Sequence, residues 1–393
     1  MKKDEKKKRI HYLDMAKAVA ACAVITCHNT YAPEGLRSSA CTLCVSMFFI
    51  ISGMLDALSH KEKKSLSATA SDRAIRLFVP YAFFSFFYAL ILIRMNYVNN
   101  APAGVFTGMD EFIFKTLSLN GASVLWFIPA FFFSEILILL LLKFADSITG
   151  GKGRGMYVTS AFFILALLLL FTFFSLELRK TYEFFAGKDF MMYLAGTFVR
   201  IPFCTFLMAV GYYVTKLWQS FEKKTEKKLI KIGTGATDKL TLIIDAALGL
   251  ILIAAHWGVN HLTSTCDVRT LTFQDPLISV VSMLLGTYGF ILIFKSLEPF
   301  AERFPLNIPG FYGRHSLEVM LTHMDLYPLY FAEVVSLKLI QFIPFYQVYI
   351  LTLMILIGVL IIDIPYLFIL DRICPFIMGK AYVYKRDTGR KPQ

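Results

Sequence analysis

The chain has 393 residues, of which 17% are charged and 56% are hydrophobic, and its mean hydropathy is +0.60. Ordinary soluble domains carry about 25% charged residues, so this composition excludes a soluble globular protein. It also excludes a disordered, collagen-like or coiled-coil chain. Because long apolar runs recur from one end to the other, we expect a single membrane bundle in place of several globular domains.

Ten apolar runs of helical length follow one another along the chain. A bilayer core about 30 Å thick requires about 20 mostly apolar residues in a helix, and a helix satisfies its own backbone groups in lipid. The sequence therefore predicts an all-α, polytopic integral membrane helical bundle of about ten transmembrane helices. The expected spans are residues 12–30, 41–59, 77–95, 122–143, 156–176, 191–215, 240–257, 276–294, 315–331 and 345–370.

The basic residues fall mainly in alternate connections between these spans. With the N-terminus placed inside, the inner segments hold 30 of the 40 Lys and Arg residues and the outer segments hold 8, while Lys17 and Arg200 lie within spans. Cytoplasmic connections carry the excess of Lys and Arg, so we expect both termini to be cytoplasmic. This predicts a basic N-terminal segment (1–11), a transmembrane bundle (12–371) and a basic tail (372–393).

The formal net charge of +12 is explained by this topology. A nucleic-acid partner would require a basic face on a folded soluble domain, and we therefore expect no nucleic acid and only membrane lipids around the bundle. His256, His261 and Asp267 lack zinc-like spacing, so no metal site is expected. The glycines between 150 and 155 form a short basic connector and not a phosphate loop after a strand, so ATP is not expected either.

Seven cysteines are an odd number, and Cys22, Cys27, Cys41, Cys44 and Cys204 lie within the expected spans. Cysteine in such a position packs as a small hydrophobic residue, so we expect no disulfide framework. Cys41 and Cys44 form a C-x-x-C pair, but no soluble redox fold surrounds them. Buried packing is the expected role of this pair.

Three ionisable residues share one face of the first span. Asp14, Lys17 and His28 are separated by 3 and 11 residues, and 11 residues bring a helix about 20° past three full turns. At 1.5 Å per residue, His28 lies about 16 Å along the helix from Lys17. Because an ionisable residue within a span is costly and usually functional, and neutral imidazole accepts protons near neutral pH, we predict that His28 is a general base. In the alternative interpretation, Asp14 and Lys17 are an interfacial ion pair and His28 is a hydrogen-bonded helix terminus.

Two arginines open the third span. Arg73 and Arg76 lie one helical turn apart, just after Ser71 and Asp72. A cationic pair near a helix N-terminus suits a phosphate group. The alternative is the ordinary positive flank of a cytoplasmic boundary.

Further polar groups are expected to be buried in later spans. Ser316 and His323 are seven residues apart and share a face, so His323 could orient a polar group, with a simple interhelical hydrogen bond as the alternative. Glu135 is expected to neutralise Lys17 or Arg200. The buried polar set, too large for a passive anchor, is Glu135, Arg200, Asp245, Ser316, His323, Asp325 and Asp363.

Several motifs, taken in chain order, resemble those of the membrane acyltransferase 3 family, especially its sugar O-acetylase branch, which is similar to fucose 4-O-acetylases. The resemblance covers nearly the whole chain. The family's pattern of Arg or Lys and then His in the first span is matched by Lys17 and His28. The other motifs are Phe48-Phe49-Ile50-Ile51-Ser52-Gly53, Arg73-Ala74-Ile75-Arg76 with Pro80, Leu125-Trp126-Phe127-Ile128-Pro129, Gly313-Arg314-His315-Ser316-Leu317 and Leu321-Thr322-His323.

This resemblance implies an integral membrane O-acyltransferase of the bacterial plasma membrane. It implies no bound cofactor, acetyl-coenzyme A or another acyl-coenzyme A as co-substrate, and a hydroxyl of a cell-surface glycan or lipid-linked sugar as acceptor. His28 would be catalytic, and Lys17, Arg73 and Arg76 would bind the donor. The supporting residues would be Asp14, Ser52, Trp126, Glu135, Ser316 and His323.

One departure from the family concerns the second span. Sugar O-acetylases often have His-Met-Pro before the phenylalanine-rich motif, whereas this chain has Cys44-Val45-Ser46. The chain therefore lacks the histidine that the resemblance would place in contact with the acceptor. The alternative function is a membrane transporter or exporter of a glycan or small anion, because buried charges also line transport paths. Matching broken helices in two halves of the chain would favour it, and the sequence shows no such pair.

Overall fold

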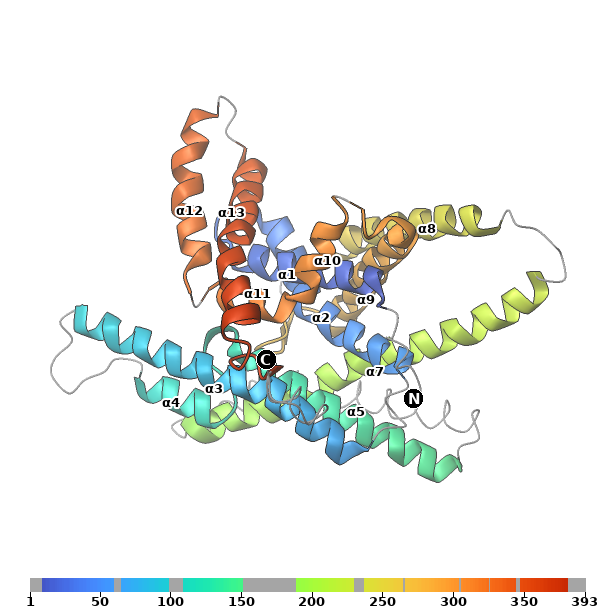
Figure 1. The fold of residues 1–393 in the computed structure, drawn as a ribbon, viewed down its shortest axis with the longest axis horizontal. Helices are drawn as coiled ribbons and strands as arrows, with labels where there is room; N and C mark the ends of the chain where they lie inside the picture. The colour runs from blue at the N-terminus through green and yellow to red at the C-terminus, as the bar shows by residue number, and fades with distance from the viewer. Residues whose placement is uncertain are drawn as a thin grey trace.

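The computed structural model describes residues 9–59, 65–98, 109–150, 189–229, 237–263, 266–303, 305–324, 326–343 and 347–380. The described part is almost entirely helical (Figure 1). Its first half consists of α1 (His11–His28), α2 (Glu34–Leu58), α3 (Leu66–Val98), α4 (Met109–Leu117), the short η2 (Ser123–Trp126), α5 (Phe127–Thr149) and α7 (Asp189–Leu229).

The second half contains the one small sheet among the described residues, an antiparallel hairpin in which Cys266 pairs with Phe273 and Asp267 with Thr272. Helix α9 begins beside it with Pro276 in the first turn, while the Asp275 carboxylate accepts hydrogen bonds from the N–H groups of Leu277 and Ile278, which caps the helix. The elements are α8 (Thr237–Asn260), β1 (Cys266–Asp267), β2 (Thr272–Phe273), α9 (Pro276–Leu297), η3 (Glu298–Phe300), α10 (Asn307–Arg314), α11 (Ser316–Thr322), α12 (Pro328–Leu339), η4 (Ile340–Phe342), α13 (Val348–Phe368) and the π-helical η5 (Ile369–Ile373).

Helices α1 and α2 form the centre of the bundle (Figure 1). Helix α1 packs against α2, α9, α10 and α11, and α2 also packs against α7. In the most apolar 18-residue stretch of α2, 83% of the stretch is buried inside the structure, whereas in that of α8 only 17% is buried. Ile243, Leu250 and Ile251 of α8 point outward although they are large and apolar, which suits contact with lipid and not with water.

Seven helices in the described part of the chain are long and apolar enough to cross a membrane, so the chain is an all-α, multi-pass membrane protein. Helix α1 is less apolar than these seven because Asp14 and Lys17 lie within it. The span expected at 156–176 lies outside the described residues. The total of about ten spans therefore stays a prediction.

The span expected at 315–331 is not one continuous helix. Helix α11 ends at Thr322 and α12 begins at Pro328. Tyr327 has a positive φ of 66°, and a residue before proline is disfavoured in the helical conformation. The chain therefore breaks directly after the helix that leads to His323.

A disulfide joins Cys27, in the last turn of α1, to Cys41 of α2. The expectation of no disulfide framework is therefore wrong. Both residues lie in apolar segments, so their surroundings in the sequence resemble those of ordinary packed cysteines, and only the turn between the two helices brings their Cα atoms to 5.0 Å. The bond links the two central helices at the end of α1 that carries His28.

Two glycines of the recognised motifs are required where helices touch. A Cβ on Gly53 of α2 would lie 1.9 Å from the Met208 carbonyl oxygen of α7, and one on Gly313 of α10 would lie 1.6 Å from the Asp14 carbonyl oxygen of α1. No side chain tolerates such an approach to backbone. The motif glycines therefore set the spacing between the central helices and their neighbours.

We predict that Gly53→Ala and Gly313→Ala each destabilise the protein by about 1–3 kcal/mol, as overpacking of a tight core does. The measurement is thermal unfolding in detergent micelles, followed by the loss of the monodisperse species. Gly258→Ala is the matched control, because its Cβ would meet nothing within 4 Å and alanine favours the helix. A Gly313→Ala protein as stable as Gly258→Ala would contradict this account of the packing.

Candidate active site

A cavity of about 280 Å³, here named the cationic cavity, lies between α1, α2, α3, α5, α10, α11 and the C-terminal segment 374–380. Five basic side chains line it: Lys17, Arg73, Arg76, Arg314 and Lys380. Three of them are the donor-binding residues predicted from the sequence. The cavity therefore gathers positive charge from four separate parts of the chain.

Carboxylates compensate Lys17 and Arg73. Lys17 Nζ lies 2.9 Å from Asp14 Oδ1, and Asp14 also pairs with Arg9 at 2.6 Å. Arg73 Nε lies 2.9 Å from Oε1 of the fully buried Glu135. The ion pair of Glu135 is thus with Arg73, whereas Lys17 and Arg200 were the partners expected from the sequence. Lys17 pairs instead with Asp14, which lies one helical turn away on the same helix.

The remaining cations of the cavity fall into two groups. Lys380 Nζ lies 2.7 Å from Glu318 Oε1 and 2.8 Å from Asp371 Oδ1, so its charge is compensated. Arg76 and Arg314 are both exposed, and neither forms an ion pair with any residue that the structure describes. Arg314 only lies over the Phe311 ring, with Cζ 5.9 Å from its centroid. These two guanidinium groups are available to an anionic ligand.

The C-terminal segment reaches this cavity through a tight turn. Gly379 has a φ of +64°, and a Cβ there would lie 2.6 Å from the Ile75 carbonyl oxygen. Glycine therefore allows the segment to lie directly against α3 beside Arg76, which brings Lys380 and Met378 to the cavity wall. Residues that we expected in a basic tail thus contribute to the candidate site.

Apart from its basic residues, the described wall of the cationic cavity contains three polar side chains, those of Ser52, Ser316 and Glu318, and is otherwise apolar. Ser52 and Ser316, both named from the sequence, line it and are buried. The apolar part of the wall consists of Phe48, Ile51, Leu55, Leu77, Phe127, Phe131, Leu317, Met320 and Met378. A ligand with a charged end and a long, weakly polar arm fits such a lining.

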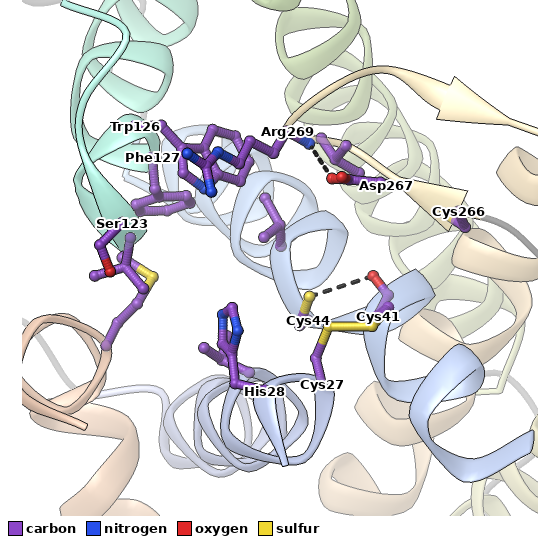
Figure 2. A pocket seen from close by; sticks show the side chains of 15 residues that line it. Cys27, His28, Cys41, Cys44, Ser123, Trp126, Phe127, Cys266, Asp267 and Arg269 are labelled. Carbon is purple, nitrogen blue, oxygen red and sulfur yellow. Dashed lines mark hydrogen bonds between the residues drawn. A yellow bond between two sulfur atoms is a disulfide. The ribbon is translucent and has the colours of Figure 1, made fainter. Parts of the chain in front are cut away.

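A second cavity of about 260 Å³, here named the histidine cavity, opens at the other end of α1 (Figure 2). His28 is exposed to it. The Cys27–Cys41 disulfide and the free thiol of Cys44 form part of its wall. The β1–β2 hairpin contributes Asp267 and Arg269 from the opposite side (Figure 2).

His323 lies beside His28 although it does not line the cavity. The two ring centroids are 5.5 Å apart, and His323 is fully buried. His323 Nδ1 donates to the Val319 carbonyl oxygen at 3.1 Å, because a nitrogen facing a carbonyl must carry the hydrogen. Its Nε2 has no hydrogen-bond partner among the described residues, and in the neutral ring it is an acceptor.

Trp126 lines the histidine cavity from the end of η2. The chain reaches this position through a sharp turn in which Leu119, Gly121 and Ser123 have positive φ. A Cβ on Gly121 would lie 2.3 Å from Trp126 N, so glycine is required for the turn. The Arg200 guanidinium lies over the indole, 5.2 Å from its centroid, and fixes the ring by a cation–π contact.

The two cavities share a wall made by Phe127 and Met320, the two residues that line both. Both cavities lie along α1. Lys17 lines the cationic cavity, and His28, 11 residues later on the same helix, lines the histidine cavity. The spacing along one helical face predicted from the sequence therefore corresponds to two neighbouring cavities. Phe127 and Met320 therefore lie between the cavity that contains Lys17 and the cavity that contains His28.

Three cations of these cavities, Arg314, Lys380 and Arg269, have no role among the predictions made from the sequence. Arg314 stands within the Gly313-Arg314-His315-Ser316-Leu317 motif, so its place in that motif was a usable signal. Lys380 lies in the expected tail, and Arg269 lies in a connection between spans. Nothing in the sequence distinguishes these two from other basic residues outside the spans.

Most of the chain matches a known protein family. A model of the acyltransferase 3 family, described as an acyltransferase domain, matches residues 10–364. Searches of curated proteins and of solved structures found no match. The matched region contains α1 and both cavities except for the C-terminal segment that carries Lys380. The chain therefore belongs to the acyltransferase 3 family and is a membrane acyltransferase.

Proposed function

We propose that the protein transfers an acetyl group from acetyl-coenzyme A, bound in the cationic cavity, to a hydroxyl of a glycan or lipid-linked sugar in the histidine cavity. The observation that carries this proposal is the shared wall of Phe127 and Met320 between a cavity rich in cations and a cavity that exposes a histidine. A polyanionic donor and an uncharged hydroxyl acceptor need these two different environments.

The cationic cavity faces the cytoplasm in this proposal, and both termini lie there too. The excess of Lys and Arg in alternate connections supports that orientation. The Cys27–Cys41 disulfide supports it independently, because it lines the histidine cavity and disulfides persist on the oxidising, outer side of a plasma membrane. Acetyl-coenzyme A is then available on one side and the cell-surface acceptor on the other.

Arg76 and Arg314 are the residues that we assign to the phosphates of the donor. Their guanidinium groups carry no ion pair within the part of the chain that the structure describes, whereas Lys17, Arg73 and Lys380 are held by carboxylates. Lys17 and Arg73, whose charges Asp14 and Glu135 compensate, then orient the donor by hydrogen bonds. Ser52 and Ser316 supply hydroxyls for its amide groups, and the apolar wall receives its flexible arm.

His28 is the general base of the proposed reaction. Its imidazole removes the proton from the acceptor hydroxyl as the oxygen attacks the thioester carbonyl. The tetrahedral intermediate then collapses, the carbon–sulfur bond breaks, and the proton on His28 passes to the departing thiolate of coenzyme A. His323 supports this step as an uncharged neighbour whose Nε2 can accept a hydrogen bond, and Trp126 offers its ring to the apolar face of a sugar.

The alternative of a transporter for a glycan or small anion is favoured by one observation. The chain breaks between α11 and α12 beside His323, and broken helices line the sites of many transporters. In that case labelled sugar would cross sealed membranes without any acyl donor, and His28→Ala would affect movement of the sugar but produce no change in acetylation.

We predict that His28→Ala lowers kcat for acetyl transfer by about 10²–10⁴-fold, the usual contribution of a general base. The measurement is transfer of labelled acetyl to added glycan by the purified full chain in detergent. His261→Ala is the matched control, because His261 is an exposed histidine that lines neither cavity. Retained transfer in the stably folded His28→Ala protein would show that another group is the base.

We predict that Arg76→Gln and Arg314→Gln each raise the KM for acetyl-coenzyme A about tenfold or more, since a charge-assisted hydrogen bond contributes about 1.5–3 kcal/mol. Their kcat should change little, because phosphate binding far from the thioester stabilises ground and transition states alike. Lys338→Gln, which removes an exposed charge that does not line the cationic cavity, is the control. An unchanged donor KM in both variants would refute the assignment.

A further inference from the structure

Arg269 is a cation of the histidine cavity that the proposed reaction does not use. It lies in the turn between β1 and β2 and lines the cavity together with His28 and Trp126. Figure 2 shows its side chain extending from the hairpin in the direction of Trp126 and Phe127. It therefore stands on the acceptor side of the shared wall.

The Arg269 guanidinium forms no ion pair with any described residue. Among the described residues that line this cavity, Asp267 is the one acidic residue. Its carboxylate is occupied by hydrogen bonds within the turn. Oδ1 accepts from the Arg269 N–H at 2.8 Å and from the Thr270 N–H at 3.4 Å, and Oδ2 accepts from the Thr270 hydroxyl at 2.8 Å. Asp267 thus shapes the turn and leaves the positive charge of Arg269 available to the cavity.

The hairpin that carries Arg269 is anchored in the bundle. Cys266, Val268 and Leu271 are buried in the main hydrophobic core, and the Phe273 ring lies 5.5 Å from the Phe203 ring of α7. Packing on both sides of residue 269 fixes its backbone. The guanidinium is therefore presented from a rigid support, as a group that recognises a ligand needs to be.

We propose that Arg269 binds an anionic group on the acceptor, so that the histidine cavity selects an acidic sugar over a neutral one. A guanidinium matches the two oxygens of a carboxylate or phosphate, and no acidic side chain of the cavity competes for it. Such a group can be the carboxylate of the sugar ring itself or the phosphate that links a sugar to a lipid. This inference rests on the proposed function only in taking the histidine cavity as the acceptor site.

A competing role for Arg269 is stabilisation of the negative charge that develops on the acetyl carbonyl oxygen. The two roles predict different kinetics. A residue that stabilises this oxyanion acts on every acceptor equally, whereas a residue that recognises the acceptor changes the ratio between acidic and neutral acceptors.

The test measures binding separately from chemistry. The His28→Ala full chain, without donor, is titrated with methyl glucoside, methyl glucuronoside and glucose 1-phosphate while tryptophan fluorescence is recorded, and Trp126→Phe identifies the signal of the cavity. We expect a Kd at least about tenfold lower for one of the two acidic probes than for methyl glucoside. The probe that binds more tightly distinguishes a ring carboxylate from a linking phosphate.

Arg269→Gln should abolish this preference and leave the Kd of methyl glucoside within about twofold, while Arg269→Lys should retain part of it, because a lysine keeps the charge but loses the bidentate geometry. Lys338→Gln should behave like the parent protein. Equal binding of acidic and neutral probes, or a preference that survives Arg269→Gln, would overturn the proposal. Since no acetyl transfer is measured, this result is independent of whether His28 acts as the base.

In the transfer assay, the same Arg269→Gln change on the His28 protein should lower kcat/KM for the preferred acidic acceptor and spare the neutral one. An equal loss on both acceptors would instead assign Arg269 to the acetyl carbonyl and would overturn the specificity role.

Discussion

Helix α1 carries an ion pair in its first turns and a histidine at its last residue, and the bundle holds this helix at both ends. At the Asp14 end the backbone of α10 approaches so closely that only Gly313 fits, and at the His28 end a disulfide joins α1 to α2. Because both cavities open on α1, any shift of this helix would move Lys17 and His28 together. The geometry of the candidate site therefore depends on the packing of one helix.

Charge compensation explains why so many ionisable groups persist in an apolar bundle. A cation removed from water is costly unless a partner or ligand compensates it, and Lys17, Arg73 and Lys380 each have a carboxylate partner. Arg76, Arg314 and Arg269 lack an ion pair within the described residues, and all three lie on cavity walls. We interpret the paired cations as structural parts of the site, and the three unpaired cations as groups that can bind an anionic ligand.

Much of this arrangement could be predicted from the sequence. The helical class follows from the lengths of the apolar runs, and the relation between Lys17 and His28 follows from their spacing on one helix. Pro328 is a local signal for the break after Thr322. The sequence nevertheless predicted one helix there, because the apolar residues on both sides form a single run. The Cys27–Cys41 bond and the ion pair between Arg73 and Glu135 depend on contacts between different helices, which periodicity within one helix does not specify. For the same reason Arg269 and Lys380 could not be placed, since their positions are set by a hairpin and a terminal turn.

We propose that an acyl group entering at the cationic cavity reaches an acceptor in the histidine cavity on the other side of the membrane. This proposal is tested most directly in sealed inside-out vesicles that enclose an acceptor sugar and receive labelled acetyl-coenzyme A from outside, on the cytoplasmic face. The account predicts label on the enclosed sugar, and none on that sugar when the vesicles contain the His28→Ala protein. Acetylation confined to sugar on the same side as the donor would contradict it.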